Sequence, residues 1–224
     1  MCGIAGLVGP WPSSLVAAMT EAIAHRGPDG QGLWADEGVA LGHRRLSIID
    51  LTDKAAQPMQ TPDGRYLLTY NGEIYNYREL RMELEQTGIV FRTASDTEGM
   101  LYLFARYGLD CVEKLSGIFA FAVWDRQSRT LSLARDHLGV KPLYYSELSM
   151  GFLFASELKA LTLCPDLPRD LDPSTVADHL GYLWTAGGNT MLKNVKKLRP
   201  GSTLTVSADG EVRQERYYRT PYFE

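Results

Sequence analysis

The alternation of apolar and polar positions predicts a chain of short strands with helices between them. The first strand is expected over residues 4–8, an apolar run that a Gly-Pro pair ends. Helical spacing follows, because Leu15, Met19 and Ile23 recur every four residues behind a Ser-Ser pair. A strand placed this early in the chain would hold a terminus that otherwise frays.

Further strands are expected along the first three quarters of the chain. In the first half they are residues 39–41, 46–49 and 66–70, and the last of these is expected to end at the turn signal Asn71-Gly72. Later segments are residues 118–124, 131–134, 143–145 and 152–155. The segment 118–124 is apolar at every position, which is typical of a strand buried on both faces in a layered structure.

Two amphipathic helices are predicted between these groups of strands. The first turns Tyr77, Leu80 and Leu84 inward. The second begins at Ser95-Asp96-Thr97-Glu98, which has the spacing of a capping box. Asp96 then lies in the first helical turn, where the helix dipole stabilises a carboxylate. Capping support alone would explain Asp96, and a functional role is compatible with it.

The character of the sequence changes after Leu161. Residues 164–173 are rich in Pro and Asp and predict a linker, and Asp172-Pro173 predicts a helix start. Short strands are expected near 203–206 and 212–217. We therefore divide the chain into a core of residues 1–161 and an extension of the same domain over residues 162–224.

Composition narrows the classes of function. The chain has 224 residues, 45% of them hydrophobic and 22% charged, with a net charge of −4, so a substantial core is expected and binding to nucleic acid is not. No apolar run reaches the ~20 residues of a membrane helix, and no signal peptide is recognisable. The three cysteines are too few and too far apart for a disulfide framework, which favours a reducing cytoplasm.

The opening Met1-Cys2-Gly3 carries the strongest candidate chemistry. A processing aminopeptidase tolerates a small second residue, so Cys2 is expected to become the first residue. Its thiol and its own α-amine would then share one carbon, with reference pKa values of about 8.5 and about 7.7–8.0. That pair is an amine-activated nucleophile. The alternative, a small buried cysteine, is left open by the opening alone.

Two glycine-containing segments are predicted to be structural turns. Residues 25–30 (HRGPDG) lack the spacing of a phosphate loop, and His25 has no second His or Cys near it at the spacing of metal ligands. Residues 136–142 (DHLGVKP) link two strands, and Lys141 is not part of a Walker loop. We expect no metal site in this chain.

Eight ordered motifs carry a resemblance to a known family. They are MCGIAG, HRGPDG, GHRRLSIIDL, YNGEIYNYREL, SDTEG, LSGIFAFAVWD, ARDHLGVKPLYY and FASELKAL. The sequence resembles the class II glutamine amidotransferase domain of the N-terminal-nucleophile hydrolases, in the asparagine synthetase branch. The hexosamine and purine branches are expected to show a TRWATHG-like stretch where this chain has HRRLSIID. The resemblance implies an α+β fold, a four-layer αββα sandwich.

The resemblance also implies the catalytic roles. Cys2 would attack the carboxamide carbon of L-glutamine, and its α-amine would pass the thiol proton to the leaving ammonia. The side-chain amide of Asn71 and the backbone N–H of Gly72 would bind the oxyanion, and water would release glutamate from the thioester.

Substrate-binding residues follow in the same way. Arg45 would bind the α-carboxylate of glutamine, and Asp96, with Glu73 nearby, would bind its α-ammonium group. The remaining pocket residues would be Leu46, Ser47, Ile48 and Ile49. The resemblance assigns no role to Arg44.

Full-length members of the family continue into an ATP-pyrophosphatase domain that opens with an SGGxDS-like loop. No such loop is present before Glu224. We expect no cofactor in this chain, with ATP and Mg needed only in a synthetase domain supplied in cis or in trans. The isolated chain should release ammonia. The acceptor substrate and a homodimer are left open.

The sequence is compatible with two other classes of function. The chain could be a catalytically silent docking or regulatory domain of the same fold, which retention of Met1 would favour. It could also be a cysteine hydrolase acting on another amide, because one fold hosts many functions. The charges of Arg45 and Asp96 suit a free amino acid and argue against the second of these.

Overall fold

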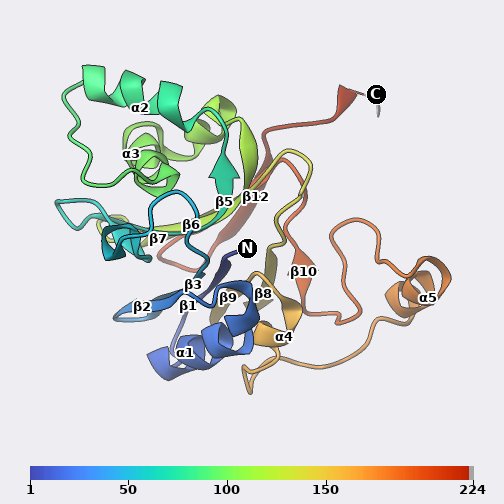
Figure 1. Ribbon diagram of the computed structural model, residues 1–224. Coiled ribbons are helices and arrows are strands. Elements are labelled where there is room, and N and C mark those ends of the chain that lie inside the picture. Colours follow the sequence, from blue (N-terminus) through green and yellow to red (C-terminus); the bar gives the residue numbers. More distant parts are fainter. Residues whose placement is uncertain (222–224) are drawn as a thin grey trace.

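Two antiparallel sheets lie face to face between two layers of helices in the computed structural model, which describes residues 1–221 (Figure 1). Each sheet has six strands. The expected four-layer αββα sandwich, an α+β fold, is therefore confirmed.

The first sheet, called sheet 1, contains the strand that begins the chain. Its strand order is β10-β8-β9-β1-β3-β2. The strands are β1 (Gly3–Val8), β2 (Gly30–Asp36), β3 (Val39–Arg45), β8 (Tyr144–Leu148), β9 (Gly151–Ala155) and β10 (Lys196–Lys197). Because β1 pairs with β3 on one side and β9 on the other, the start of the chain is held in the middle of this sheet.

The second sheet, called sheet 2, has the strand order β12-β11-β7-β6-β5-β4. Its strands are β4 (Met59–Gln60), β5 (Tyr66–Ile74), β6 (Gly117–Asp125), β7 (Thr130–Arg135), β11 (Ser202–Val206) and β12 (Val212–Arg216). In this sheet β5 and β6 are neighbours and pair along nine residues, from Tyr66 opposite Asp125 to Ile74 opposite Gly117.

The helices cover the outer faces of the sheets. On sheet 1 lie α1 (Ser13–Ala22) and α4 (Leu158–Leu161), and on sheet 2 lie α2 (Tyr77–Gln86) and α3 (Asp96–Tyr107) (Figure 1). α5 (Pro173–Tyr182) stands apart, with only Thr175 buried. Short 3-10 helices are η1 (Ala24–Arg26), η2 (Asp53–Ala55) and η3 (Gly108–Lys114). Within residues 1–221 no helix has the length and apolar character needed to cross a membrane.

Alternating side chains of β6 fill two different cores, which explains why residues 118–124 are apolar at every position. Ala120, Ala122 and Trp124 pack between the sheets, whereas Phe119 and Phe121 pack beneath α3. Burial of a large apolar side chain contributes ~1.5–3 kcal/mol, so both layers of the fold depend on this strand.

Two predicted strand boundaries were wrong. Residues 39–41 and 46–49 were expected to be separate strands, but β3 runs unbroken to Arg45 because it pairs with β1 and β2 on both sides, and residues 46–49 form a loop. The strand expected over 66–70 continues to Ile74, because Asn71 and Gly72 pair with β6.

Both predicted helix caps are confirmed, with one difference. The Asp172 side chain accepts a hydrogen bond from Ser174 N at the start of α5, and Ser95 Oγ accepts from Glu98 N at the start of α3. The reciprocal half of the capping box is absent, because the Glu98 carboxylate accepts instead from the N–H groups of Arg92 and Thr93.

The segment after residue 161 contributes strands to both sheets. β10 extends sheet 1, and β11 pairs with β7 in sheet 2. The division of the chain at residue 161 stays a prediction, and the last three residues of the 162–224 extension lie outside the described residues.

Replacing the buried Glu98 should destabilise the fold. Its carboxylate is 1% exposed and accepts from two backbone N–H groups and from Thr93 Oγ1. Glu98→Ala removes these hydrogen bonds to a charged, buried acceptor, so we expect the free energy of unfolding to fall by about 2–4 kcal/mol in urea titrations. Glu79→Ala, at an exposed position of α2, should cost less than about 0.5 kcal/mol. A loss below about 1 kcal/mol for Glu98→Ala would contradict this account.

Candidate active site

A pocket of about 110 Å³ lies where β1 begins, β3 ends and the last residues of β5 meet the start of α3. The structure brings all ten predicted site residues into its wall. They are Cys2, Arg45, Leu46, Ser47, Ile48, Ile49, Asn71, Gly72, Glu73 and Asp96. We call it the Cys2 pocket. Their grouping is a finding, and their individual roles stay predictions.

Cys2 is positioned by the strand that follows it. Gly3 lies opposite Arg44, so the register of β1 sets the Cys2 side chain beside the end of β3. Leu46 N donates a hydrogen bond to Sγ at 3.4 Å. Burial raises the pKa of the Cys2 thiol, while the Leu46 N–H and the positive charge of the chain terminus act in the opposite direction. The thiol is therefore protonated at rest and needs a base.

Arg26 holds the backbone of Cys2, a contact that the sequence interpretation did not assign. Its Nε donates to Cys2 O at 2.9 Å, and Glu157 binds its Nη1 at 3.0 Å. His25 also contacts Glu157, as expected for a hydrogen-bonded loop residue. The turn packs closely on β3 because Gly27 has no side chain: a Cβ there would lie 2.4 Å from Arg44 C. Arg26 belongs to the HRGPDG motif, which was the available signal.

Two hydrogen-bond donors of β5 face the pocket. Asn71 is 1% exposed, and within residues 1–221 its Nδ2 has no hydrogen-bond partner. Gly72 lies where a Cβ would be 2.5 Å from Ile118 O, so only glycine fits beside β6. A buried donor without a partner costs about 1–3 kcal/mol, and a ligand oxygen would recover that cost.

His43 lies buried behind this part of the pocket. Its Nε2 is 3.0 Å from Tyr70 O, and burial lowers the pKa of His43 to about 4. The imidazole is therefore neutral at physiological pH, with Nε2–H donating to that carbonyl. It supports the strand without adding charge to the site.

Asp96 reaches the pocket from the first turn of α3. Tyr70 Oη donates to its Oδ2 at 2.7 Å, and Ile74 N donates to the same oxygen at 3.1 Å. Burial raises the pKa of Asp96, and these two hydrogen bonds oppose the shift. Besides its place in the first turn of α3, the Asp96 side chain therefore joins that helix to β5.

Arg45 is engaged with the loop that follows it. Its guanidinium donates to the carbonyl oxygens of Asp50 and Thr52, the latter at 2.8 Å. A carboxylate ligand would therefore have to use the remaining N–H groups of Arg45 or displace these carbonyls.

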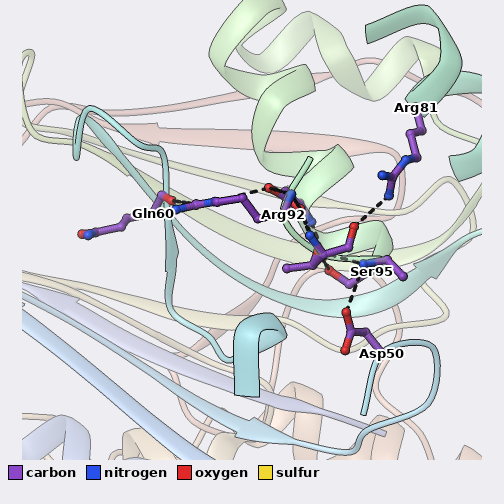
Figure 2. Close-up of polar contacts among 8 residues, drawn as sticks. Asp50, Gln60, Arg81, Arg92 and Ser95 are labelled. Carbon is purple, nitrogen blue, oxygen red and sulfur yellow. Dashed lines mark hydrogen bonds and ion pairs between the residues drawn. The ribbon is translucent and has the colours of Figure 1, made fainter. Parts of the chain in front are cut away.

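Figure 2 shows how the segment before α3 is fixed. Asp50 accepts from Ala94 N at 3.0 Å, Arg81 Nη1 donates to Thr93 O at 2.8 Å, and Arg92 Nη2 donates to Gln60 O at 3.3 Å. Asp50 belongs to the loop after β3, and its carbonyl also accepts a hydrogen bond from Arg45. The network therefore connects that loop with the segment before α3, and both contribute residues to the wall of the Cys2 pocket.

Sequence interpretation also missed Tyr70 and Lys141. Both line the Cys2 pocket, but one was assigned to a strand and the other to a structural turn. The signal available for Lys141 was a lysine among small and apolar residues between two strands. Within residues 1–221, His, Cys, Asp and Glu form no group of three placed to hold a metal ion.

The fold and the pocket define a class of protein. A cysteine at the start of a central strand, in an αββα sandwich with an adjacent unpartnered amide donor, is the arrangement expected of N-terminal-nucleophile hydrolases. Comparison with known proteins narrows the class further. The family model described as "Glutamine amidotransferase domain" matches residues 1–218. This chain belongs to that family.

Curated relatives identify the branch. The chain is 38% identical over 229 residues to asparagine synthetase (glutamine-hydrolyzing) 1 of Bacillus subtilis (strain 168), covering 99% of this chain and 36% of the relative. It is 40% identical over 219 residues to asparagine synthetase (glutamine-hydrolyzing) 3 of the same organism, covering 94% of this chain and 35% of the relative. The resemblance to the asparagine synthetase branch is confirmed, and the chain spans about a third of these relatives.

A solved structure supports the fold. The glutamine phosphoribosylpyrophosphate amidotransferase of B. subtilis, complexed with ADP and GMP, aligns with a TM-score of 0.73 at 21% identity. The alignment covers 98% of this chain and 50% of that one. A silent docking domain is not favoured, because the Cys2 thiol, the Asn71 amide and several charged side chains line one pocket in a chain whose relatives are glutamine-hydrolyzing asparagine synthetases.

Replacing Asp96 by Asn should raise the stability of the fold at neutral pH while turnover of glutamine is lost. Since burial raises the pKa of Asp96 in the folded state, its ionisation opposes folding, and stability is lost as pH rises through that pKa. Asp96→Asn keeps an oxygen for Tyr70 and Ile74 and removes the charge. We expect a higher urea midpoint than wild type at neutral pH and no gain at a pH where Asp96 is protonated.

The same variant should lose turnover of glutamine. Asp110→Asn, at an exposed position, serves as the control and should change neither property. A lower urea midpoint for Asp96→Asn at neutral pH would contradict the assignment of Asp96 as a costly buried charge.

Proposed function

We propose that this chain hydrolyses L-glutamine to glutamate and ammonia through a thioester on Cys2. One observation carries the proposal: the Cys2 thiol, the unpartnered Asn71 amide and the buried Asp96 carboxylate line a single pocket. Together they supply a nucleophile, an oxyanion donor and a group that binds a cation. A free amino acid with an amide side chain matches all three.

Removal of Met1 creates the base. Met1 is 56% exposed, so an aminopeptidase can reach it. The α-amine of Cys2 then accepts the thiol proton as Sγ attacks the carboxamide carbon of glutamine. The same amine returns the proton to the departing nitrogen, and ammonia leaves as the C–N bond breaks.

Asn71 and Gly72 stabilise the negative charge that develops on the carboxamide oxygen. Both donors belong to β5, whose pairing with β6 fixes them before the substrate arrives. Preorganised donors cost no reorganisation during the reaction, which is why each contributes strongly to the rate.

The amino-acid end of glutamine is recognised by charge. Asp96, with Glu73 beside it in the pocket wall, binds the α-ammonium group, and Arg45 binds the α-carboxylate. Leu46, Ser47, Ile48 and Ile49 belong to the loop that Arg45 closes and line the same pocket. Water then attacks the thioester carbonyl, which frees glutamate and restores the thiol.

We further propose that the ammonia is used by an ATP-dependent synthetase domain, in cis or in trans. The names of the relatives, asparagine synthetases that are glutamine-hydrolyzing, support aspartate as the acceptor carboxylate. ATP and Mg would belong to that domain, and no cofactor would be needed for the hydrolysis itself. Three free cysteines support a reducing cytoplasm as the location.

Glutamate release from glutamine tests the proposal. The wild-type chain should form glutamate, and Cys2→Ala should lose at least about a thousandfold in kcat. Cys164→Ala, which removes a buried thiol far from the pocket, should retain turnover. Activity that survives in Cys2→Ala, or a wild-type chain that cleaves another amide and not glutamine, would overturn the proposal.

The Asn71 amide should act in the transition state. Asn71→Ala removes the donor, and we expect kcat to fall about 10²–10³-fold while KM changes by less than about threefold. Asn71→Asp, which keeps the shape but replaces the donor with an acceptor, should be at least as defective. A loss confined to KM would show that Asn71 binds ground-state glutamine rather than the oxyanion.

A further inference from the structure

Lys141 places a cation in the wall of the Cys2 pocket. No step of the proposed reaction involves this side chain. It follows β7 and precedes β8, and it is 7% exposed. Within residues 1–221 no side-chain or backbone oxygen accepts a hydrogen bond from its Nζ, although its backbone N–H and C=O are both bonded. The ammonium group is thus available to the pocket.

The turn that carries Lys141 is held by two buried charges. The Asp136 carboxylate accepts from the backbone N–H groups of Val140 and Lys141, both at 2.9 Å. The Arg135 guanidinium donates to the carbonyls of Lys141 and Gly139, both at 2.7 Å. The backbone of Lys141 therefore has little freedom, and its side chain starts from a fixed point.

The charge on Lys141 interacts with the reacting cysteine. Burial and the positive charge of Arg26 lower the pKa of the Lys141 ammonium, whereas Cys2, Asp136 and Glu73 act in the opposite direction. Lys141 and Cys2 line the same pocket, which is partly shielded from water, and charges influence each other more strongly there than in bulk solvent.

Several charged or titratable groups surround Cys2 from the neighbouring elements. They are Arg26 and Glu157 on the side of η1, His43 and Arg45 on β3, Tyr70 and Glu73 on β5, Asp96 on α3 and Lys141 after β7. His43 is neutral, and Glu157 is paired with Arg26. Asp96 and Glu73 are the acids that the glutamine ammonium group would neutralise. Of the three cations in this group, Arg26 and Arg45 are hydrogen-bonded, and within residues 1–221 the Lys141 ammonium has no hydrogen-bond partner.

A fixed cation beside an amine and a thiol lowers the pKa of both groups. It disfavours the ammonium form of the α-amine and favours the thiolate. The pair must lose one proton to become reactive, whichever of the two atoms carries the proton that remains. A nearby positive charge lets that loss occur at lower pH.

We propose that Lys141 is a positioning residue whose charge sets the pH at which the amine and thiol of Cys2 together lose their first proton. The inference rests on the proposed function, since the α-amine exists only after Met1 is removed. Lys141 touches neither the carboxamide nor the oxyanion in this scheme, and it acts through Cys2.

The pH dependence of kcat/KM for glutamine tests the proposal. In Lys141→Met the acidic limb of the profile should move to higher pH by roughly half a unit. At pH values on that limb kcat/KM should be about threefold below the wild-type value, and on the plateau the two should be similar. Lys141→Arg keeps the charge and should restore the limb. Lys196→Met, on the edge strand β10, removes an exposed lysine and should change nothing. An unmoved limb with an equal loss at every pH would overturn the proposal.

Alkylation of Cys2 by iodoacetamide gives a readout that needs no glutamine. The other two cysteines are buried, so the label reports Cys2. The pH at which the alkylation rate rises should be higher in Lys141→Met than in the wild type. In Lys141→Arg it should return to the wild-type value. If the alkylation profile shifts while the wild type fails to hydrolyse glutamine, the proposed function has failed and the role of Lys141 stands. If glutamine is hydrolysed but neither profile moves, the role of Lys141 is refuted.

Circular dichroism of each variant separates this role from a structural one. Should Lys141→Met fail to fold, Lys141→Gln carries the same test with a polar side chain. Unfolding of both neutral variants, with Lys141→Arg folded, would make Lys141 a structural residue and overturn the proposal.

Discussion

The pairing of β1 on both sides is the constraint on which the site depends. The second residue of a chain normally belongs to a mobile end. Here β3 and β9 flank the strand that starts at Gly3, and Arg26 binds the carbonyl of Cys2. Two neighbouring strands of sheet 1 and the turn that carries Arg26 therefore fix a residue near the chain end that would otherwise be mobile. A terminal amine can serve as a base only if its position is this well determined.

The pocket keeps polar groups in states that are unfavourable without a ligand. Asn71 has a buried donor without a partner in the described part of the chain, and burial raises the pKa of Asp96. Each feature costs stability, and glutamine would relieve both at once. The network around Glu98 and the Asp50 contact to Ala94 stabilise the segment that presents Asp96. The rigid surroundings thus hold the polar groups of the pocket in an arrangement that costs stability until a ligand binds.

Much of the fold and the membership of the pocket could be predicted from the sequence. Apolar spacing located β1, β6 and α3, and the motifs brought together Cys2, Arg45, Asn71 and Asp96. The errors fell where long-range pairing overrides local signals: turn-forming Asn71 and Gly72 lie inside β5 because β6 pairs with them. The contacts of Arg26, Tyr70 and Lys141 with the pocket depend on how distant segments meet, and no local pattern contains that information.

Mass spectrometry of the protein quenched in acid during turnover of glutamine tests the central claim most directly. We expect a chain that begins at Cys2 and carries one γ-glutamyl group on its first peptide, bound through the Cys2 sulfur. Turnover by a chain that retains Met1, or a γ-glutamyl group on any other residue, would contradict it.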